Sequence, residues 1–426
     1  MRQERNNIFE NIDWILVFLF ILLVGFGWMN IYAASKTEET VELLSFSTKY
    51  GKQLIFISLT IPLIIIILFF NSKFYEQFSS ILYILSLLSL LGLFIFGKEI
   101  NGARSWYNFG LIGLQPSEFV KAFTALAVAK LLSDRKYNLK LVKNQAKAFI
   151  IIFIPAILIT LQPDAGSAII YLAFFFVLNR EGLTLNYIIF GSLLIFLFIL
   201  TIFFGYISVL IFLLILITLV SFYAIYKGGK RFIRFNMYKI LAIYLIAILF
   251  TFGTNFTYNN IFKQHHRDRF EVLLGIKIDI KNIGYNSHQS ELTISSGSWT
   301  GKGFLKGDIT KGDFVPEQHT DYIFSTVGEE WGFLGSSFVI ILFMLMLYRI
   351  IYLSETHSNK FGRIYGYSVA SILFFHIIVN IGMVIGLLPT VGIPLPFFSY
   401  GGSSLWGFTV LLFIFIRLDA HKNYDW

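Results

Sequence analysis

Residues 52–70 read KQLIFISLTIPLIIIILFF, a stretch with no charged side chain after Lys52. An α-helix rises about 1.5 Å per residue, so about 20 residues of this kind cross the hydrocarbon core of a bilayer. A helix also satisfies its own backbone hydrogen bonds there, where no water is present to do so. The stretch therefore predicts a membrane-spanning helix.

The same criterion identifies eleven further apolar stretches, of which those at 117–133 and 166–179 are short. The twelve predicted spans are 13–34, 52–70, 78–98, 117–133, 146–162, 166–179, 186–204, 207–226, 239–257, 333–353, 366–388 and 404–417. The first span is too long for the core of a signal peptide, so we expect it to remain as an anchor. The pattern predicts an all-α polytopic membrane protein of about twelve transmembrane helices, forming a single integral membrane domain over residues 1–426.

Composition agrees with this class. The 426 residues are 56% hydrophobic and 14% charged, whereas a soluble domain has about 25% charged residues, so a water-soluble globule is excluded. Cysteine is absent, which excludes disulfides, thiolate nucleophiles and Cys-ligated metals.

The formal net charge of +9 indicates topology rather than nucleic-acid binding. Basic residues gather in the loops 134–147, 227–239 and 354–365, which fall on one side if the spans alternate. By the positive-inside rule this side is cytoplasmic, and both termini lie there too. The same alternation places the long loop 258–322, with eight basic and eight acidic residues, outside. A polar loop of this length is usually functional, although a solvated connector is the plain alternative.

The first group of informative residues runs from Asn101 to Lys121. Glu118 follows a proline at a helix start, where an acidic side chain is ordinary N-terminal chemistry. Lys121 lies one turn into a predicted span, where a charge indicates function and a partner such as Glu118 or Asp164; the alternative is a lysine that reaches to the interface. Trp106 is either an interfacial aromatic or, beside Arg104, a ring that stacks on a sugar.

The second and third groups also lie on the predicted outer side. Asp164 stands between two spans, as a helix cap or in the wall of a polar cavity. Glu317, His319 and Asp321 fall within five residues and can supply a general base or hold a divalent metal, but their spacing is not that of a zinc peptidase. Upstream, residues 295–303 read SSGSWTGKG, a flexible basic stretch that does not match a phosphate-binding loop.

The fourth group is the segment from Gly386 to Ser404, which includes Ser399 and three prolines within eight residues. Irregular backbone at membrane depth survives only where it is buried in protein or lines a cavity. The segment is therefore expected to form the wall of a site rather than a plain turn.

Together the four groups resemble the shape, elongation, division and sporulation family of integral membrane proteins. The match runs from Asn101 to Ser404, and its most specific segments are 316–324 and 389–404. Residues 264–270, with Arg269, also resemble family positions. The sequence Pro-Glu-Gln-His-Thr-Asp at 316–321 is more similar to that of elongation members than to that of division members. The family usually has ten spans, and the surplus pair is expected in the plain region 187–256.

The resemblance implies a peptidoglycan glycosyltransferase in the bacterial cytoplasmic membrane that polymerises lipid II, an undecaprenyl-pyrophosphate disaccharide peptide, on the outer face. It implies a class B penicillin-binding protein as partner within the elongation complex. The family's essential acidic position falls on Asp321, the expected catalytic base. Expected substrate-binding residues are Arg104, Trp106, Glu118, Lys121, Asp164, Arg269, Glu317, His319 and Ser399.

The transfer has a simple physical form. A carboxylate takes the proton of the acceptor hydroxyl as the oxygen attacks the donor's anomeric carbon, with inversion. Arg104, Lys121, other loop cations or a divalent cation such as Mg²⁺ or Mn²⁺ can stabilise the leaving pyrophosphate; no organic cofactor is expected. The alternatives are a flippase for lipid-linked precursors, a division-type polymerase and a non-catalytic scaffold.

Overall fold

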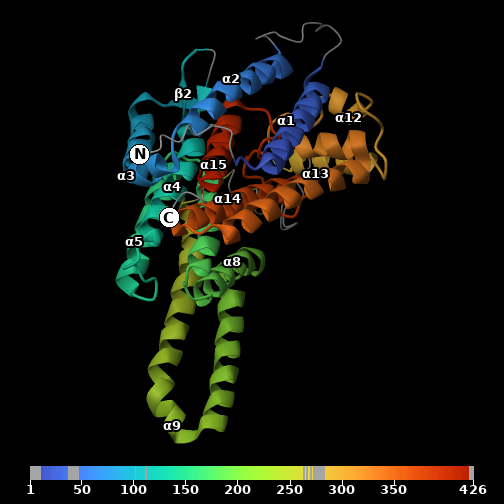
Figure 1. Ribbon diagram of the computed structural model, residues 1–426. Coiled ribbons are helices and arrows are strands. Elements are labelled where there is room, and N and C mark those ends of the chain that lie inside the picture. The colour runs from blue at the N-terminus through green and yellow to red at the C-terminus, as the bar shows by residue number, and fades with distance from the viewer. Residues whose placement is uncertain are drawn as a thin grey trace, which may run out of the picture. The chain divides into compact units, whose positions relative to one another are not determined.

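The computed structural model describes residues 11–36, 48–100, 102–110, 113–261, 264, 267–268, 271 and 284–421. For residues 100, 224 and 228–237 the description covers the backbone alone. The chain divides into two compact units, residues 1–183 with 286–426, and residues 184–285. Most of the described chain is helical (Figure 1).

The first unit holds most of the elements. Its helices are α1 (Trp14–Ser35), α2 (Lys49–Phe69), α3 (Ser72–Phe96), α4 (Pro116–Ser133), α5 (Val142–Leu161), α6 (Ala165–Ile169), the 3₁₀ helix η1 (Ile170–Ala173), α7 (Phe174–Arg180), α11 (Tyr285–Ser296), α12 (Asp308–Lys311), α13 (Ile323–Thr356), α14 (Lys360–Val384) and α15 (Gly402–Ala420). Three short strands, β1 (Lys98–Ile100), β2 (Ala103–Asn108) and β3 (Gly113–Leu114), pair antiparallel in the order β1-β2-β3.

The centre of this unit is formed by α4, α14 and α15, which pack on one another. The most apolar stretch of α15 is 89% buried and that of α14 is 67% buried, against 28% for α2 and for α3. The outer helices expose isoleucine, leucine and phenylalanine, as lipid-facing helices do. Figure 1 shows α13 and α14 lying side by side, in agreement with their contacts.

The second unit contains α8 (Asn186–Phe204), α9 (Tyr206–Phe256) and the π-helix η2 (Thr257–Ile261). Figure 1 shows α9 folding back on itself as two long arms. Tyr244 donates a hydrogen bond to the carbonyl of Leu214 at 3.4 Å and so joins the arms.

Ten helices in the described chain are long and apolar enough to cross a membrane, which confirms a polytopic all-α membrane protein but not the count of twelve. The predicted span 117–133 forms α4, a helix that carries Glu118 and Lys121 inside the bundle and has the composition of an interior helix. The predicted span 166–179 is divided among α6, η1 and α7. The two spans beyond the family's usual ten were expected in 187–256, yet three apolar spans, α8 and the two arms of α9, occupy that region.

Candidate functional site

Asp321 lies at the end of a tight turn, two residues before α13 begins. The turn starts at Glu317, whose φ of 57° is left-handed, and whose carbonyl accepts from the amides of Thr320 at 3.0 Å and Tyr322 at 3.4 Å. A Cβ on Gly392 would lie 3.3 Å from Asp321 Oδ2. The carboxyl therefore sits directly beside the proline-rich segment predicted to form a wall.

Burial and the negative charges of Glu317, Asp164 and Glu118 raise the pKa of Asp321 to about 7. These three acidic groups come from three different parts of the sequence, so the fold gathers them around one carboxyl. A general base works best when its pKa lies near the operating pH. A carboxyl with a pKa in this range is a candidate general base.

Asp164 joins the first and second groups. Its Oδ1 accepts from the amide of Ser167 at 3.0 Å, which caps α6, and its Oδ2 accepts from Gln115 Nε2 at 2.9 Å. The amide of Gln115 in turn donates to Ser403 Oγ at 2.6 Å, which joins the first group to the fourth. The capping interpretation of Asp164 is confirmed, and its carboxylate also acts on Asp321.

Glu118 and Lys121 form a buried ion pair inside the bundle. Lys121 Nζ lies 2.8 Å from Glu118 Oε2 and 2.9 Å from His376 Nε2, and 5.0 Å from the centre of the Phe408 ring. Both charged side chains are at most 3% exposed, so Lys121 does not reach to the interface. A buried charge of this kind survives only when its hydrogen bonds are made.

Glu317 and His319 lie on the same turn as Asp321, the first exposed and the second buried. Lys49 Nζ approaches His319 Nδ1 at 3.4 Å, and since an ammonium group only donates, Nδ1 accepts. His319 Nε2 lies 3.8 Å from Glu317 Oε2. Burial, and then the charge of Lys49, lower the pKa of His319, so the imidazole is neutral at neutral pH.

Ser399 is buried, and its hydroxyl is engaged within the protein. It donates to the carbonyl of Thr320 at 2.6 Å and accepts from the amide of Leu395 at 2.8 Å. The side chain therefore connects the Asp321 turn to the proline-rich segment. Its contact with substrate stays a prediction.

Arg104 and Trp106 lie on β2, which contacts α3 and α4. Arg104 is exposed, with Nη1 3.5 Å from the carbonyl of Phe94, and its amide donates to the carbonyl of Gln162 at 3.2 Å. Trp106 is half-buried and covers Gly113, where a Cβ would lie 3.1 Å from its ring. Arg269 lies outside the described residues.

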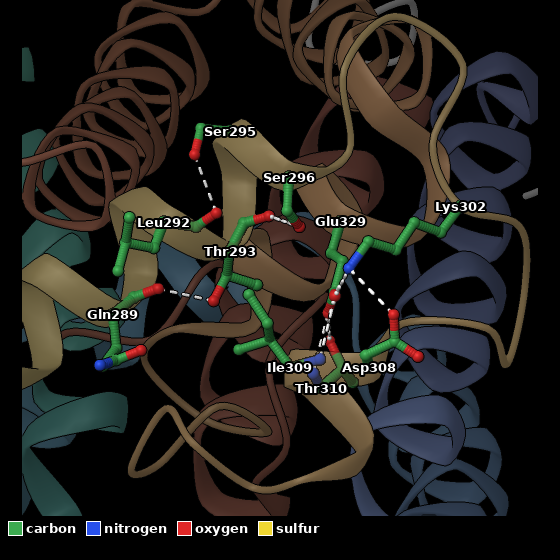
Figure 2. A network of polar contacts seen from close by, with 10 residues as sticks. All are labelled: Gln289, Leu292, Thr293, Ser295, Ser296, Lys302, Asp308, Ile309, Thr310 and Glu329. Atoms are coloured by element: carbon green, nitrogen blue, oxygen red, sulfur yellow. Dashed lines mark hydrogen bonds and ion pairs between the residues drawn. The ribbon is translucent and has the colours of Figure 1, made fainter.

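A second polar network anchors α12 and the loop before it to α13 (Figure 2). The fully buried carboxylate of Glu329 accepts from Lys302 Nζ at 2.7 Å, from the amides of Ile309 and Thr310 at 3.0 and 2.8 Å, and from Thr310 Oγ1 at 2.6 Å. Lys302 also lies 3.4 Å from Asp308. We call this set of contacts the Glu329 clamp.

The stretch 295–303, expected to be flexible, instead pairs with the backbone of α13. The helix breaks at Gly332, with φ 64° and ψ −160°. The carbonyls of Glu329 and Glu330 accept from the amides at 302 and 303, and the amides at 333 and 334 donate to the carbonyls at 298 and 299. Backbone groups freed by the break are thus satisfied, as a buried helix end requires.

Sequence reasoning missed His376 and Asn380, which lie on α14. Asn380 Nδ2 donates to the carbonyls of Asp321 and Ile393, both at 2.7 Å. The signal was present, because polar side chains within the apolar span 366–388 mark functional positions by default. Lys49, at the start of α2, was also missed.

The described residues contain no group of three His, Asp or Glu side chains placed to hold a metal ion. The described carboxylates around Asp321 therefore do not form a metal site made of protein ligands alone.

A family model described as cell cycle protein, for the FtsW, RodA and SpoVE proteins, matches residues 13–213 and 237–424. The chain belongs to this family. Similar proteins in the family include the peptidoglycan glycosyltransferase RodA of Treponema pallidum, 28% identical over 97% of this chain and 98% of that protein. The peptidoglycan glycosyltransferase MrdB of Escherichia coli K12 is 28% identical over 97% of this chain and 95% of that protein.

Solved structures agree. A chain of a peptidoglycan synthase complex that coordinates polymerization and crosslinking has a TM-score of 0.69 and 26% identity, over 97% of this chain and 99% of that chain. The rod shape determining protein RodA of Thermus thermophilus has a TM-score of 0.62 at 24% identity, over 97% and 98%, and supports the fold. The expected family, and peptidoglycan glycosyltransferase activity of the elongation type, are confirmed.

Proposed function

We propose that this glycosyltransferase polymerises lipid II at the outer face of the bacterial cytoplasmic membrane, with Asp321 as general base. The observation that carries the proposal is the Asp321 carboxyl, half-buried at the point where all four sequence groups meet. Its pKa of about 7 is set by burial and by Glu317, Asp164 and Glu118. Both termini are placed in the cytoplasm, and a class B penicillin-binding protein is the proposed partner.

The transfer needs one proton movement and one charge to be stabilised. Asp321 accepts the proton of the acceptor sugar's hydroxyl while the oxygen attacks the anomeric carbon of the donor, and pyrophosphate leaves from the opposite face. Among the described residues, Arg104, exposed on β2, and Lys49, exposed beside His319, are two cations that can face a pyrophosphate. Lys121 is already paired with Glu118 inside the bundle, so its role is to hold that carboxylate.

A divalent cation, Mg²⁺ or Mn²⁺, is proposed on the pyrophosphate of the donor rather than in a cage of protein ligands. Mg²⁺ commonly binds substrate phosphates together with one or two carboxylates. Adding a chelator to the polymerisation assay tests this, because activity should fall while the melting temperature of the protein stays the same.

The decisive experiment compares wild type with Asp321→Ala, each purified with the penicillin-binding partner and supplied with labelled lipid II in detergent. Wild type should make glycan polymer, and the variant should lose about 100-fold or more of the rate, as general bases contribute about 10²–10⁴-fold. Ser295→Ala, an exposed change in α11 whose hydroxyl bonds only its own helix, is the matched control. Polymer from a folded Asp321→Ala variant at the wild-type rate would remove Asp321 as the base. No polymer from any variant, with partner bound, would favour the flippase.

A further inference from the structure

Three consecutive carbonyl groups of the Asp321 turn are each bound by a donor from α14 or from the segment after it. The carbonyl of His319 accepts from the amide of Tyr400 at 3.0 Å. The carbonyl of Thr320 accepts from Ser399 Oγ at 2.6 Å, and that of Asp321 accepts from Asn380 Nδ2 at 2.7 Å. The backbone that carries the Asp321 carboxyl is thus held at residues 319, 320 and 321.

Asn380 makes the connection closest to the carboxyl. Its Nδ2 also donates to the carbonyl of Ile393 at 2.7 Å, the residue after Gly392, which lies against Asp321 Oδ2. Both amide hydrogens are therefore used to join the two segments on either side of the carboxyl. Because these acceptors are backbone atoms, Asn380 fixes the position of the main chain rather than the charge of a neighbour.

Asn380 is costly as a packing residue. It is fully buried within α14, and its Oδ1 has no hydrogen-bond partner among the described residues. An unpaired polar atom in an apolar interior destabilises the fold; a leucine of similar size would remove that atom but leave the carbonyls of Asp321 and Ile393 without their donor. A general base must lie within hydrogen-bond distance of the proton it removes, and a misplacement of about 1 Å can cost about 100-fold in rate.

We propose that Asn380 is a positioning residue for glycosyl transfer, which holds the backbone of Asp321 so that its carboxyl meets the acceptor hydroxyl. The proposal rests on the proposed role of Asp321 as general base. Asn380 itself touches no substrate. Ser399 supports the same turn at the neighbouring carbonyl.

The test is Asn380→Leu in the full chain, purified with its penicillin-binding partner and assayed with lipid II. We expect kcat to fall about 10- to 100-fold, with KM within about twofold, because substrate contacts are unchanged. The acidic limb of the kcat–pH profile should move to lower pH, since a released carboxyl gains water while Glu317, Asp164 and Glu118 recede from it. A residue that only fills space would not move that limb.

Asn30→Leu is the matched control. Asn30 is also a fully buried asparagine in a membrane helix with an unpartnered Oδ1, but its Nδ2 donates to its own helix at Phe26. We expect wild-type kcat and an unmoved pH profile. If Asn380→Leu does not fold, Ser399→Ala takes its place. This change frees only the Thr320 carbonyl and the Leu395 amide, so kcat should fall as well, but by a smaller factor.

Asp321→Ala in the same assay separates the two proposals. If Asp321→Ala is inactive and a folded Asn380→Leu keeps the wild-type kcat and pH profile, the positioning role of Asn380 is wrong. The role of Asp321 as general base is then retained. The positioning role is equally wrong if Ser399→Ala, used in its place, is indistinguishable from wild type. If Asp321→Ala is active, both proposals fall together.

Discussion

Single carboxylates in this molecule differ in what surrounds them. Glu118 is paired with Lys121 at 2.8 Å, and Glu329 is paired with Lys302 and accepts from two amides and a hydroxyl. Asp321, in contrast, is acted on by other acids. The first two carboxylates have cationic partners, whereas burial and neighbouring acids raise the pKa of Asp321 to about 7.

The pH dependence of the rate follows from this environment. Burial, Glu317, Asp164 and Glu118 raise the pKa of Asp321 from 3.8 to about 7, and a base acts only when deprotonated. We expect kcat to rise with pH through about 7 and to level off above it. A polymerisation assay from pH 5 to 9 checks this.

Glu317→Gln removes one of the negative charges and keeps the shape of the side chain. The midpoint of the kcat–pH profile should then move to lower pH, because less repulsion opposes ionisation of Asp321. A midpoint near 4 in wild type would contradict the assigned environment.

The break in α13 shows how an element is shaped by a distant segment. Its carbonyls and amides around Gly332 bond to residues 298–303, and the turn before Gly332 carries the Glu329 clamp. The broken helix and the loop therefore fold as one element, although about 30 residues separate them in sequence.

Gly332→Ala should destabilise the protein by about 3 kcal/mol or more, because its backbone lies in a region that essentially only glycine adopts. A Cβ there would also lie 2.3 Å from the amide nitrogen of Gly301. Gly25→Ala in α1 has nothing within 4 Å and should be neutral or stabilising by up to about 1 kcal/mol. Thermal unfolding in detergent measures both. If the Gly332→Ala and Gly25→Ala variants had equal melting temperatures, the break of α13 at Gly332 would not be part of the folded state.

At the scale of the whole molecule, the sequence predicted the class of the protein, whereas the site residues it singled out stay a prediction. Hydropathy alone identified most spans, because lipid imposes one strong constraint on composition. The convergence of Asp164, Glu118 and Glu317 on Asp321 was not readable, since it depends on the packing of α4, α6 and α14. Asn380 was hidden within a span identified only by its apolar character.

The pairing of residues 295–303 with α13 was not predicted from the sequence, for a related reason. The stretch is rich in glycine and serine, a composition typical of flexible chain, and nothing local indicates a partner. Glycine here serves instead for close approach, as at Gly297, where a Cβ would lie 1.9 Å from the carbonyl of Gly328.

Topology can be tested with single cysteines introduced directly, since the chain has no cysteine of its own. Lys136→Cys, in the proposed cytoplasmic loop, and Ser295→Cys, in the proposed outer loop, are both exposed positions. A membrane-impermeant maleimide on intact cells should label the Ser295→Cys variant alone, and both after lysis. Labelling of Lys136→Cys in intact cells would reverse the orientation.

The Glu329 clamp also bears on how the enzyme can be inhibited. α12 is fastened to α13 through one carboxylate, and Thr310 in α12 accepts at its carbonyl from Gln318, three residues before Asp321. In the proposed topology α12 lies on the outer side, where a compound that competes for Glu329 would disturb the turn of the proposed base without passing through the cytoplasmic membrane. Membrane permeability and drug efflux from the cytoplasm would then not limit such a compound.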